Sequence, residues 1–171
     1  LTKFPIEVKV LPSMDNIVNG VVSIDNIKHV GVVDILGRDT VAPKQKLLKR
    51  NIKGKNILIT GAGGSIGSEL SRQIMNLSPQ KIVLLDNSEF NLYTIHQELS
   101  SLLINVEIVP TLCTVTNYHQ LKSLINIHQI NTIYHAAAYK HVPMVELNVV
   151  SGAYNNIIGT YNVAKVADEL K

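Results

Sequence analysis

The chain has 171 residues, which is enough for one domain or for one domain and part of another. Apolar residues make up 46% of it and charged residues 17%, so a globally disordered protein is excluded. The net charge of +3 gives no general sign of nucleic-acid binding, and we expect no nucleic-acid partner. A single cysteine, Cys113, excludes an intrachain disulfide framework and suits a reducing compartment. No apolar run is long enough to cross a bilayer.

Residues 1–36 do not share the pattern of the rest of the chain. Residues 6–10 alternate between apolar and polar side chains as a half-buried strand does, and 21–24 form a second candidate strand. We therefore expect 1–36 to be the tail of a preceding domain and a connector, and the chain to be part of a longer protein.

Residues 37–55 concentrate lysine and arginine and contain Asp39 as their single acid. Pro43 suits the first turn of a helix, so the segment is expected to be a basic linker helix. A solvated linker and a segment that faces anionic lipid beside a membrane both agree with this composition.

From residue 56 onward, predicted strands and helices alternate. Strands are expected at 56–60, 81–85, 105–109 and 131–135, and helices at 65–77, 88–103, 117–128 and 151–171, with Ser88 and Asn117 as N-caps and Pro143 opening a further helix. Loops are expected at 110–116 and 136–142. The first two strands are apolar without alternation, as strands buried on both faces are. This order predicts an α/β domain with a doubly wound parallel sheet over 56–171.

A glycine-rich turn joins the first of these strands to the first helix. Gly61, Gly64 and Gly67 form a Gly-x-x-Gly-x-x-Gly variant of the dinucleotide-binding fingerprint, in the strand–turn–helix context that the fingerprint requires. Without side chains, the backbone can approach a ligand closely, and the free N–H groups of a helix N-terminus favour a phosphate. The turn therefore predicts a dinucleotide-binding (Rossmann) fold.

Asp86 ends the next strand, about 20 residues after the last glycine of the turn. A carboxylate in this place accepts hydrogen bonds from the adenosine ribose hydroxyls and repels a 2′-phosphate. No arginine follows within several residues, so NAD is the expected cofactor and NADP is disfavoured.

The same turn also matches two other motifs. Gly63-Gly64-Ser65-Ile66-Gly67 fits the Gly-x-Ser-x-Gly elbow of serine hydrolases, which needs an acid and a histidine after further strands and does not need Asp86. A Walker A phosphate-binding loop is excluded because no Lys-Ser or Lys-Thr pair follows the glycines.

The segment after the fourth strand lies where ligands bind in open α/β sheets. Ala136, Ala137 and Ala138 offer small side chains where the backbone must pass close to a cofactor. Lys140 and His141 are candidates to face a sugar nucleotide, although an ordinary exposed loop also explains them.

The histidines show no zinc-ligand spacing, so no metal site is expected. His135 is expected to be a hydrogen-bonded core group. Asn155 and Asn156 are expected to bond across to the loop after the fourth strand, and Cys113 is expected to be inert because no positive charge lies beside it.

Several of these motifs resemble extended short-chain dehydrogenase/reductases: Thr60-Gly61-x-x-Gly64-x-x-Gly67, Ala136-Ala137-Ala138 and Asn156-x-x-Gly159-Thr160. Three longer strings resemble, more narrowly, the bacterial polysaccharide-biosynthesis nucleoside-diphosphate-sugar 4,6-dehydratases. They are Asp34-Ile35-Leu36-Gly37-Arg38, Leu85-Asp86-Asn87-Ser88-Glu89-Phe90 and His135-Ala136-Ala137-Ala138-Tyr139-Lys140-His141-Val142-Pro143.

The resemblance implies a lyase that uses NAD. NAD takes hydride from C4 of a UDP-N-acetylhexosamine such as UDP-N-acetylglucosamine, water leaves across C5–C6, and hydride returns to C6. Carried over, Gly61, Gly64 and Gly67 hold the pyrophosphate with the backbone N–H groups of Ser65 and Ile66, and Asp86 holds the adenosine ribose. Lys140 and His141 then lie near the cofactor and the sugar nucleotide.

The sequence departs from the family in one pair of residues. The family usually has an Asp-Val pair after the third strand, whose Asp bonds the adenine, and this chain has Thr114-Val115. The Thr114 hydroxyl or the backbone must then make that contact. The catalytic Ser/Thr-Asp-Lys segment of the family is expected after Lys171, so the chain alone is expected to be inactive.

Two alternatives stay open, a sugar-nucleotide epimerase and a non-catalytic NAD- or nucleotide-binding module. We expect a homo-oligomer with a UDP-sugar substrate and a cytoplasmic location. Anchoring to the inner face of the bacterial membrane through upstream segments also stays open.

Overall fold

The computed structural model of the chain describes residues 9–10, 28–29, 44–102 and 104–170. The chain divides into two compact units, residues 1–43 and residues 44–171. In the first unit, β1 (Lys9–Val10) pairs antiparallel with β2 (Lys28–His29). β1 falls within the strand expected at 6–10, whereas the strand expected at 21–24 lies outside the described residues.

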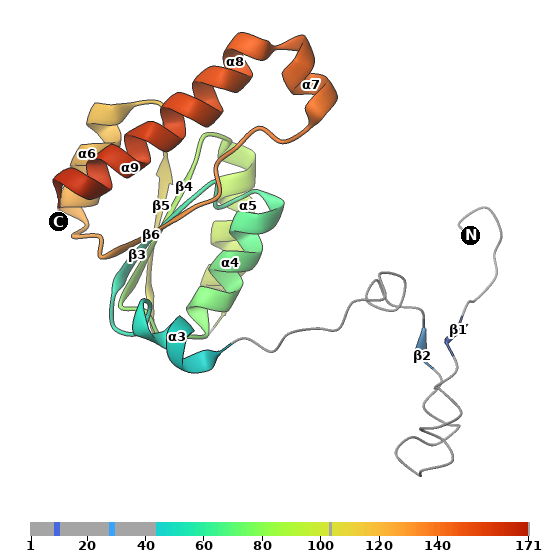
Figure 1. The fold of residues 1–171 in the computed structure, drawn as a ribbon. Helices are drawn as coiled ribbons and strands as arrows, with labels where there is room; N and C mark the ends of the chain where they lie inside the picture. The colour runs from blue at the N-terminus through green and yellow to red at the C-terminus, as the bar shows by residue number, and fades with distance from the viewer. Residues whose placement is uncertain (1–8, 11–27, 30–43, 103, 171) are drawn as a thin grey trace. The chain divides into compact units, whose positions relative to one another are not determined.

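The second unit alternates helices and strands along the chain (Figure 1). Its elements are α3 (Gln45–Arg50), β3 (Asn56–Thr60), α4 (Ser65–Met75), β4 (Lys81–Asp86), α5 (Glu89–Ser100), β5 (Glu107–Leu112), α6 (Tyr118–Ile127), β6 (Thr132–His135), α7 (Val142–Leu147), α8 (Val149–Ala153), the π-helical turn η2 (Tyr154–Ile158) and α9 (Gly159–Glu169). None of these described helices is both long and apolar enough to cross a bilayer.

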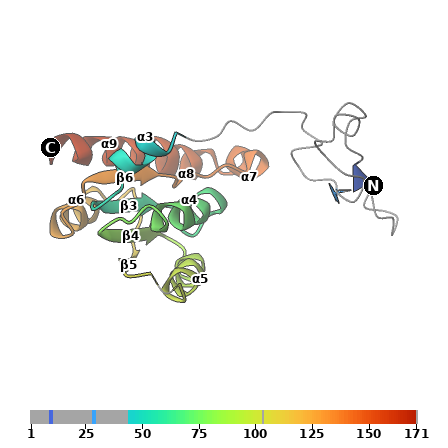
Figure 2. The same ribbon diagram turned by 90° about the horizontal axis from the view of Figure 1, so that it is seen from below.

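The four strands β3 to β6 form one parallel sheet in the order β5-β4-β3-β6. Figure 2 shows them in a row, with α6 on one side and α4 on the other. Ile57 and Ile59 of β3 pack in the cluster that includes α4 and α5, whereas Leu58 packs in the cluster that includes α6 and α9. Alternate side chains of one strand thus serve both faces, and the doubly wound α/β fold is confirmed.

The predicted signals for the inner strands and the helix starts are confirmed. β3 is buried along its whole length, and so is β4 after Lys81. Ser88 caps α5 by accepting a hydrogen bond from Asn91 N, and Asn117 caps α6 by accepting one from Gln120 N. These caps are local, which is why the sequence reveals them.

The third strand of the sheet is present as predicted, but its predicted bounds were wrong. The expected strand at 105–109 ended before Pro110, but β5 runs from Glu107 to Leu112 and includes this proline. Among the described strands, β5 lies at the edge of the sheet and pairs with β4 alone, so one side of its backbone has no ladder partner there. A residue without an N–H is tolerated there because no ladder hydrogen bond has to be lost.

The last helix also differs from the prediction of a single helix at 151–171. Helical structure begins at Val149, and a π-helical turn, Tyr154–Ile158, separates α8 from α9. The sequence pattern of a helix does not reveal a turn that holds one extra residue, because the spacing of apolar side chains shifts only slightly.

Part of the expected basic linker packs on the domain. Ile52 is 2% exposed and belongs to the core cluster of α4 and α5. The Asn51 carbonyl accepts a hydrogen bond from Thr132 Oγ1 at 2.9 Å, and Gly54 N donates to Ser78 O at 2.9 Å. Residues 44–55 therefore contribute to the second unit, although the sequence placed them in the segment 37–55 between two domains.

This packing predicts unequal effects of two substitutions in the same segment. Ile52→Ala should lower the free energy of unfolding by about 2–5 kcal/mol, because it leaves a cavity in the core. Leu47→Ala removes a side chain that is 58% exposed, and its effect should stay within about 0.5 kcal/mol. Urea unfolding followed by circular dichroism measures both. Equal, small effects would show that the segment is a linker that does not support the core.

Candidate functional site

The glycine turn between β3 and α4 leaves no room for a side chain at Gly61, Gly63 or Gly67. Gly61 has φ +64°, in the left-handed region that glycine adopts without steric cost, and a Cβ there would lie 2.8 Å from backbone atoms of Ala136 and Ala137. A Cβ on Gly67 would lie 1.9 Å from the Gly61 carbonyl oxygen. The start of α4, the turn and the end of β6 therefore touch through their backbones.

Asp86 joins this turn to the start of the next helix. Its side chain is 6% exposed. Oδ2 accepts a hydrogen bond from Gly63 N at 2.9 Å, and Oδ1 accepts one from Ser88 N at 2.9 Å. A carboxylate has about four acceptor positions, so both oxygens keep the capacity to accept further hydrogen bonds. Asp86, which is predicted to bind a ribose, thus also holds the glycine turn in place through its hydrogen bond with Gly63 N.

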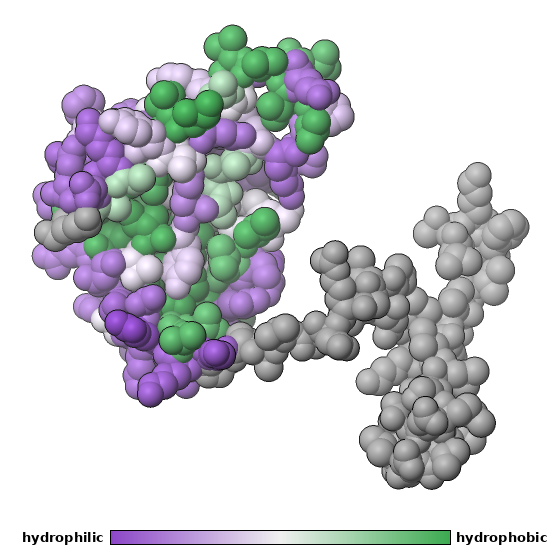
Figure 3. All heavy atoms as spheres, in the orientation of Figure 1, coloured by the Kyte–Doolittle hydropathy of each residue, from purple (hydrophilic) through white to green (hydrophobic). Residues whose placement is uncertain are grey.

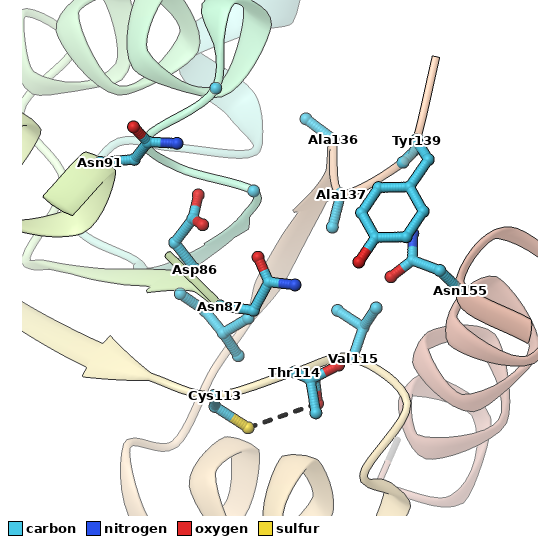
Figure 4. A pocket seen from close by; sticks show the side chains of 14 residues that line it. Asp86, Asn87, Asn91, Cys113, Thr114, Val115, Ala136, Ala137, Tyr139 and Asn155 are labelled. Atoms are coloured by element: carbon cyan, nitrogen blue, oxygen red, sulfur yellow. Dashed lines mark hydrogen bonds between the residues drawn. The ribbon is translucent and has the colours of Figure 1, made fainter. Parts of the chain in front are cut away.

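A cleft opens where the four parallel strands end, as expected for ligand sites of this fold (Figure 4). Asp86 and Asn91 lie on one side of it, and Tyr139 and Asn155 lie on the other. Every strand end contributes to its lining, which consists of Gly61, Gly64, Leu85, Asp86, Asn87, Asn91, Cys113, Thr114, Val115, Ala136, Ala137, Ala138, Tyr139 and Asn155.

Most of the residues predicted to bind the cofactor line this cleft. Ser65, Ile66 and Gly67 do not, and they form the first turn of α4 behind Gly64, where Ile66 is 64% exposed. No lysine or arginine is among the described residues that line the cleft, so Asp86 is its one charged side chain there. Nor do the described residues hold a group of three or more His, Cys, Asp or Glu side chains that could bind a metal ion.

Thr114 and Cys113 form the floor of the cleft beside β5. Thr114 Oγ1 lies 2.9 Å from Thr116 Oγ1 and accepts a hydrogen bond from Thr116 N at 3.3 Å, so its hydroxyl already has partners within its own loop. Burial raises the pKa of the Cys113 thiol, which keeps it protonated at neutral pH and unreactive.

An asparagine of the π turn holds the far wall of the cleft. Asn156 Oδ1 accepts a hydrogen bond from Tyr139 N at 2.8 Å, and Asn156 Nδ2 donates one to Tyr139 O at 2.9 Å. Asn155, which is buried, donates to Asn156 Oδ1 at 3.0 Å. The expected bond from this pair of residues to the loop after β6 is confirmed for Asn156.

His135 ends β6 and is hydrogen-bonded through both ring nitrogens. Nδ1 lies 2.7 Å from Thr60 Oγ1, and Nε2 lies 3.0 Å from Thr160 Oγ1. The predicted hydrogen bonding of His135 is confirmed, but the predicted core position is not, because the residue is only partly buried. Burial lowers the pKa of the imidazole, which favours its neutral form.

The two residues predicted to bind substrate lie beside the cleft. Lys140 and His141 are exposed and line a second hollow of about 370 Å³ together with residues of α7 and α8. The hollow shares Ala138 and Tyr139 with the cleft. Figure 3 shows apolar residues gathered over α7 and α8, where the exposed ones are Val142, Met144, Leu147, Val149 and Val150.

The sequence did not single out two polar residues of the cleft. Asn87 follows Asp86 directly, and Asn91 lies in the first turn of α5, where its Cβ is 2.5 Å from the position of an added Cβ on Gly63. Their place after the carboxyl end of a parallel strand is the signal that could have found them.

The crowding at Gly67 predicts a loss of stability. Gly67→Ala should lower the free energy of unfolding by about 1–3 kcal/mol, because the methyl group forces α4 away from the Gly61 carbonyl. Gly64→Ala is the matched control, because its Cβ would lie 3.3 Å from the same oxygen and requires only a small shift. Thermal unfolding measures the difference between them. A Gly67→Ala variant as stable as the wild type would contradict the close approach.

Several known proteins resemble this chain in sequence or in fold. The capsular polysaccharide biosynthesis protein CapD of Staphylococcus aureus is 44% identical over 165 residues, which are 96% of this chain and 28% of that protein. The inverting UDP-N-acetylglucosamine 4,6-dehydratase of Campylobacter jejuni is 32% identical over 111 residues, covering 64% of this chain and 31% of that enzyme. A 3-oxoacyl-[acyl-carrier protein] reductase of Brucella melitensis with bound NAD superposes with a TM-score of 0.56 at 23% identity. The superposition covers 75% of this chain and 53% of the reductase. This likeness concerns the fold alone.

The chain spans less than a third of the length of these two curated relatives. Its residues 57–171 match the family described as polysaccharide biosynthesis protein. That match includes the glycine turn, Asp86 and the whole lining of the cleft. The chain therefore belongs to the polysaccharide biosynthesis protein family, on a Rossmann-type fold shared with short-chain dehydrogenase/reductases.

Proposed function

We propose that this chain supplies the NAD-binding part of a nucleoside-diphosphate-sugar 4,6-dehydratase of polysaccharide biosynthesis. The observation that carries the proposal is the cleft at the carboxyl ends of four parallel strands, bounded by the Gly61–Gly67 turn and by Asp86. Relatives named for capsular polysaccharide biosynthesis and for UDP-N-acetylglucosamine 4,6-dehydration support it.

The residues of the cleft suit NAD. Gly61 and Gly64 bring bare backbone to the rim, and the N-terminus of α4 behind them favours a pyrophosphate. The free acceptor positions of Asp86 suit the hydroxyls of the adenosine ribose. When bound, NAD supplies the acceptor and the donor of hydride.

The remaining walls of the cleft have separate roles in this proposal. Thr114 and Val115 lie beside the adenine, where the backbone makes the contact because the Thr114 hydroxyl is already bonded within its loop. On the opposite wall, the small side chains of Ala136, Ala137 and Ala138 leave space for the cofactor.

We further propose that the substrate is a UDP-sugar, with UDP-N-acetylglucosamine as the first candidate. Lys140 and His141 are exposed beside the hollow that adjoins the cleft, and the charge of a lysine attracts a diphosphate. A sugar-nucleotide epimerase and a non-catalytic nucleotide-binding module are the competing functions. We also propose that the protein assembles as a homo-oligomer and lies in the cytoplasm, on the inner face of the bacterial membrane.

The cofactor proposal predicts a preference for NAD. Calorimetry should show NAD binding at least about tenfold tighter than NADP, because a 2′-phosphate would meet the Asp86 carboxylate and no cation in the cleft. Asp86→Asn should reduce the ratio of NAD affinity to NADP affinity. Glu89→Gln, which neutralises an exposed acid nearby, should leave that ratio unchanged. Tighter binding of NADP by the wild type would overturn the proposal.

The catalytic proposal predicts that the 171 residues bind NAD but form no product. Incubation with UDP-N-acetylglucosamine and NAD should yield no 4-keto sugar, because the chain covers 28% of the length of CapD and the acid–base residues are expected outside it. The Campylobacter jejuni dehydratase serves as the positive control. A product lighter than the substrate by one water would disprove the expected inactivity, and an isomer of unchanged mass would favour an epimerase.

A further inference from the structure

A chain of hydrogen bonds crosses the sheet from β3 to the π turn, and its proton positions can be deduced. Thr160 Oγ1 donates to the backbone carbonyl oxygen of Asn156 at 2.6 Å. A carbonyl oxygen can only accept, so the single hydroxyl proton of Thr160 is committed to it. Toward His135 Nε2, at 3.0 Å, Thr160 can therefore only accept, and Nε2 must carry a proton.

The protonation state of Nδ1 follows from that of Nε2. A neutral imidazole carries one proton, so Nδ1 is bare and accepts from Thr60 Oγ1 at 2.7 Å. Thr60 is fully buried, and burial lowers the pKa of His135, so the neutral form prevails at neutral pH. The bonds thus run in one direction, from Thr60 through His135 and Thr160 to Asn156.

Both ends of this chain touch the wall of the cleft. Thr60 directly precedes Gly61, and its carbonyl oxygen and Oγ1 accept from Ala136 N at 3.1 and 3.2 Å. Asn156 bonds both backbone groups of Tyr139. The wall 136–139 is therefore held at its first residue by Thr60 and at its last residue by Asn156.

The π turn explains how one helix can serve both contacts. Asn156 lies within η2, and its carbonyl accepts from Thr160 while its side chain reaches Tyr139. In the same turn, Asn155 lines the cleft. A π-helical turn is less favourable than an α-helical one and is often retained at functional sites.

We propose that His135 is a positioning residue of the cofactor cleft, which as the neutral Nε2–H tautomer couples the glycine turn to the wall 136–139 through Thr60 and Thr160. The inference rests on the proposed function where it concerns NAD. The tautomer and the order of the wall are properties of the protein without cofactor and can be measured separately.

Nitrogen-15 spectra of the histidine ring in the unliganded chain test the tautomer. We expect His135 to show a protonated Nε2 and a bare Nδ1 at pH 7. Thr160→Val removes the acceptor for Nε2–H at an exposed position, and it should shift His135 toward a mixture of tautomers, whereas Thr160→Ser should leave the spectrum unchanged. An Nδ1–H tautomer or a charged ring in the wild type would overturn the proposal.

Amide hydrogen exchange and calorimetry test the coupling. In Thr160→Val, the exchange of Tyr139 N–H should become about tenfold faster although Asn156 is intact, and the affinity for NAD should fall about tenfold. Thr160→Ser should stay within about twofold of the wild type in both measurements. Unchanged exchange at Tyr139 in a folded Thr160→Val variant would refute the coupling. If the wild type binds no NAD, the proposed function fails, and the tautomer and the exchange rates alone decide this inference.

Discussion

The contact on which the site depends is the backbone approach between the start of α4 and the turn that precedes it. There is no space for a Cβ between Gly67 and the Gly61 carbonyl, and Gly61 itself lies against the backbone after β6. Because these contacts involve backbone atoms, they fix the path of the chain more firmly than side-chain packing does. The carboxylate of Asp86 then holds the same turn through Gly63 N.

The parallel sheet converts this local turn into a cleft. Its two inner strands are buried on both faces and bring the ends of β3, β4, β5 and β6 to one edge. Residues far apart in the sequence meet there, with a carboxylate on one side and small alanines on the other. The edge position of β5 lets the strand include Pro110, and the floor of the cleft continues directly from it.

The wall opposite Asp86 is held by polar bonds at both ends, and Ala137 between them packs against the apolar cluster that includes α6 and α9. Ala136 is bonded to Thr60 and Tyr139 to Asn156, while His135 links the two ends beneath them. A polar network of this kind favours one geometry, and at its buried end, Thr60, a broken bond leaves a costly unpaired group. The proposed NAD site depends on this edge of the sheet, and the hollow lined by Lys140 and His141 adjoins it.

The sequence by itself determined the features that depend on neighbouring residues: the glycine turn, the acid that ends β4, the helix caps and the alternation of strands and helices. Only the tertiary structure decided that Ile52 belongs to the core, that Asn87 and Asn91 line the cleft, and that His135 lies between two threonines. It also decided that the last helix contains a π turn. The positions of Ile52 and His135 depend on contacts between segments distant in the sequence, which no local pattern of side chains encodes. Asn87 and Asn91 line the cleft because the ends of parallel strands meet at one edge of the sheet. The π turn shifts the spacing of apolar side chains too little for the sequence pattern to reveal it.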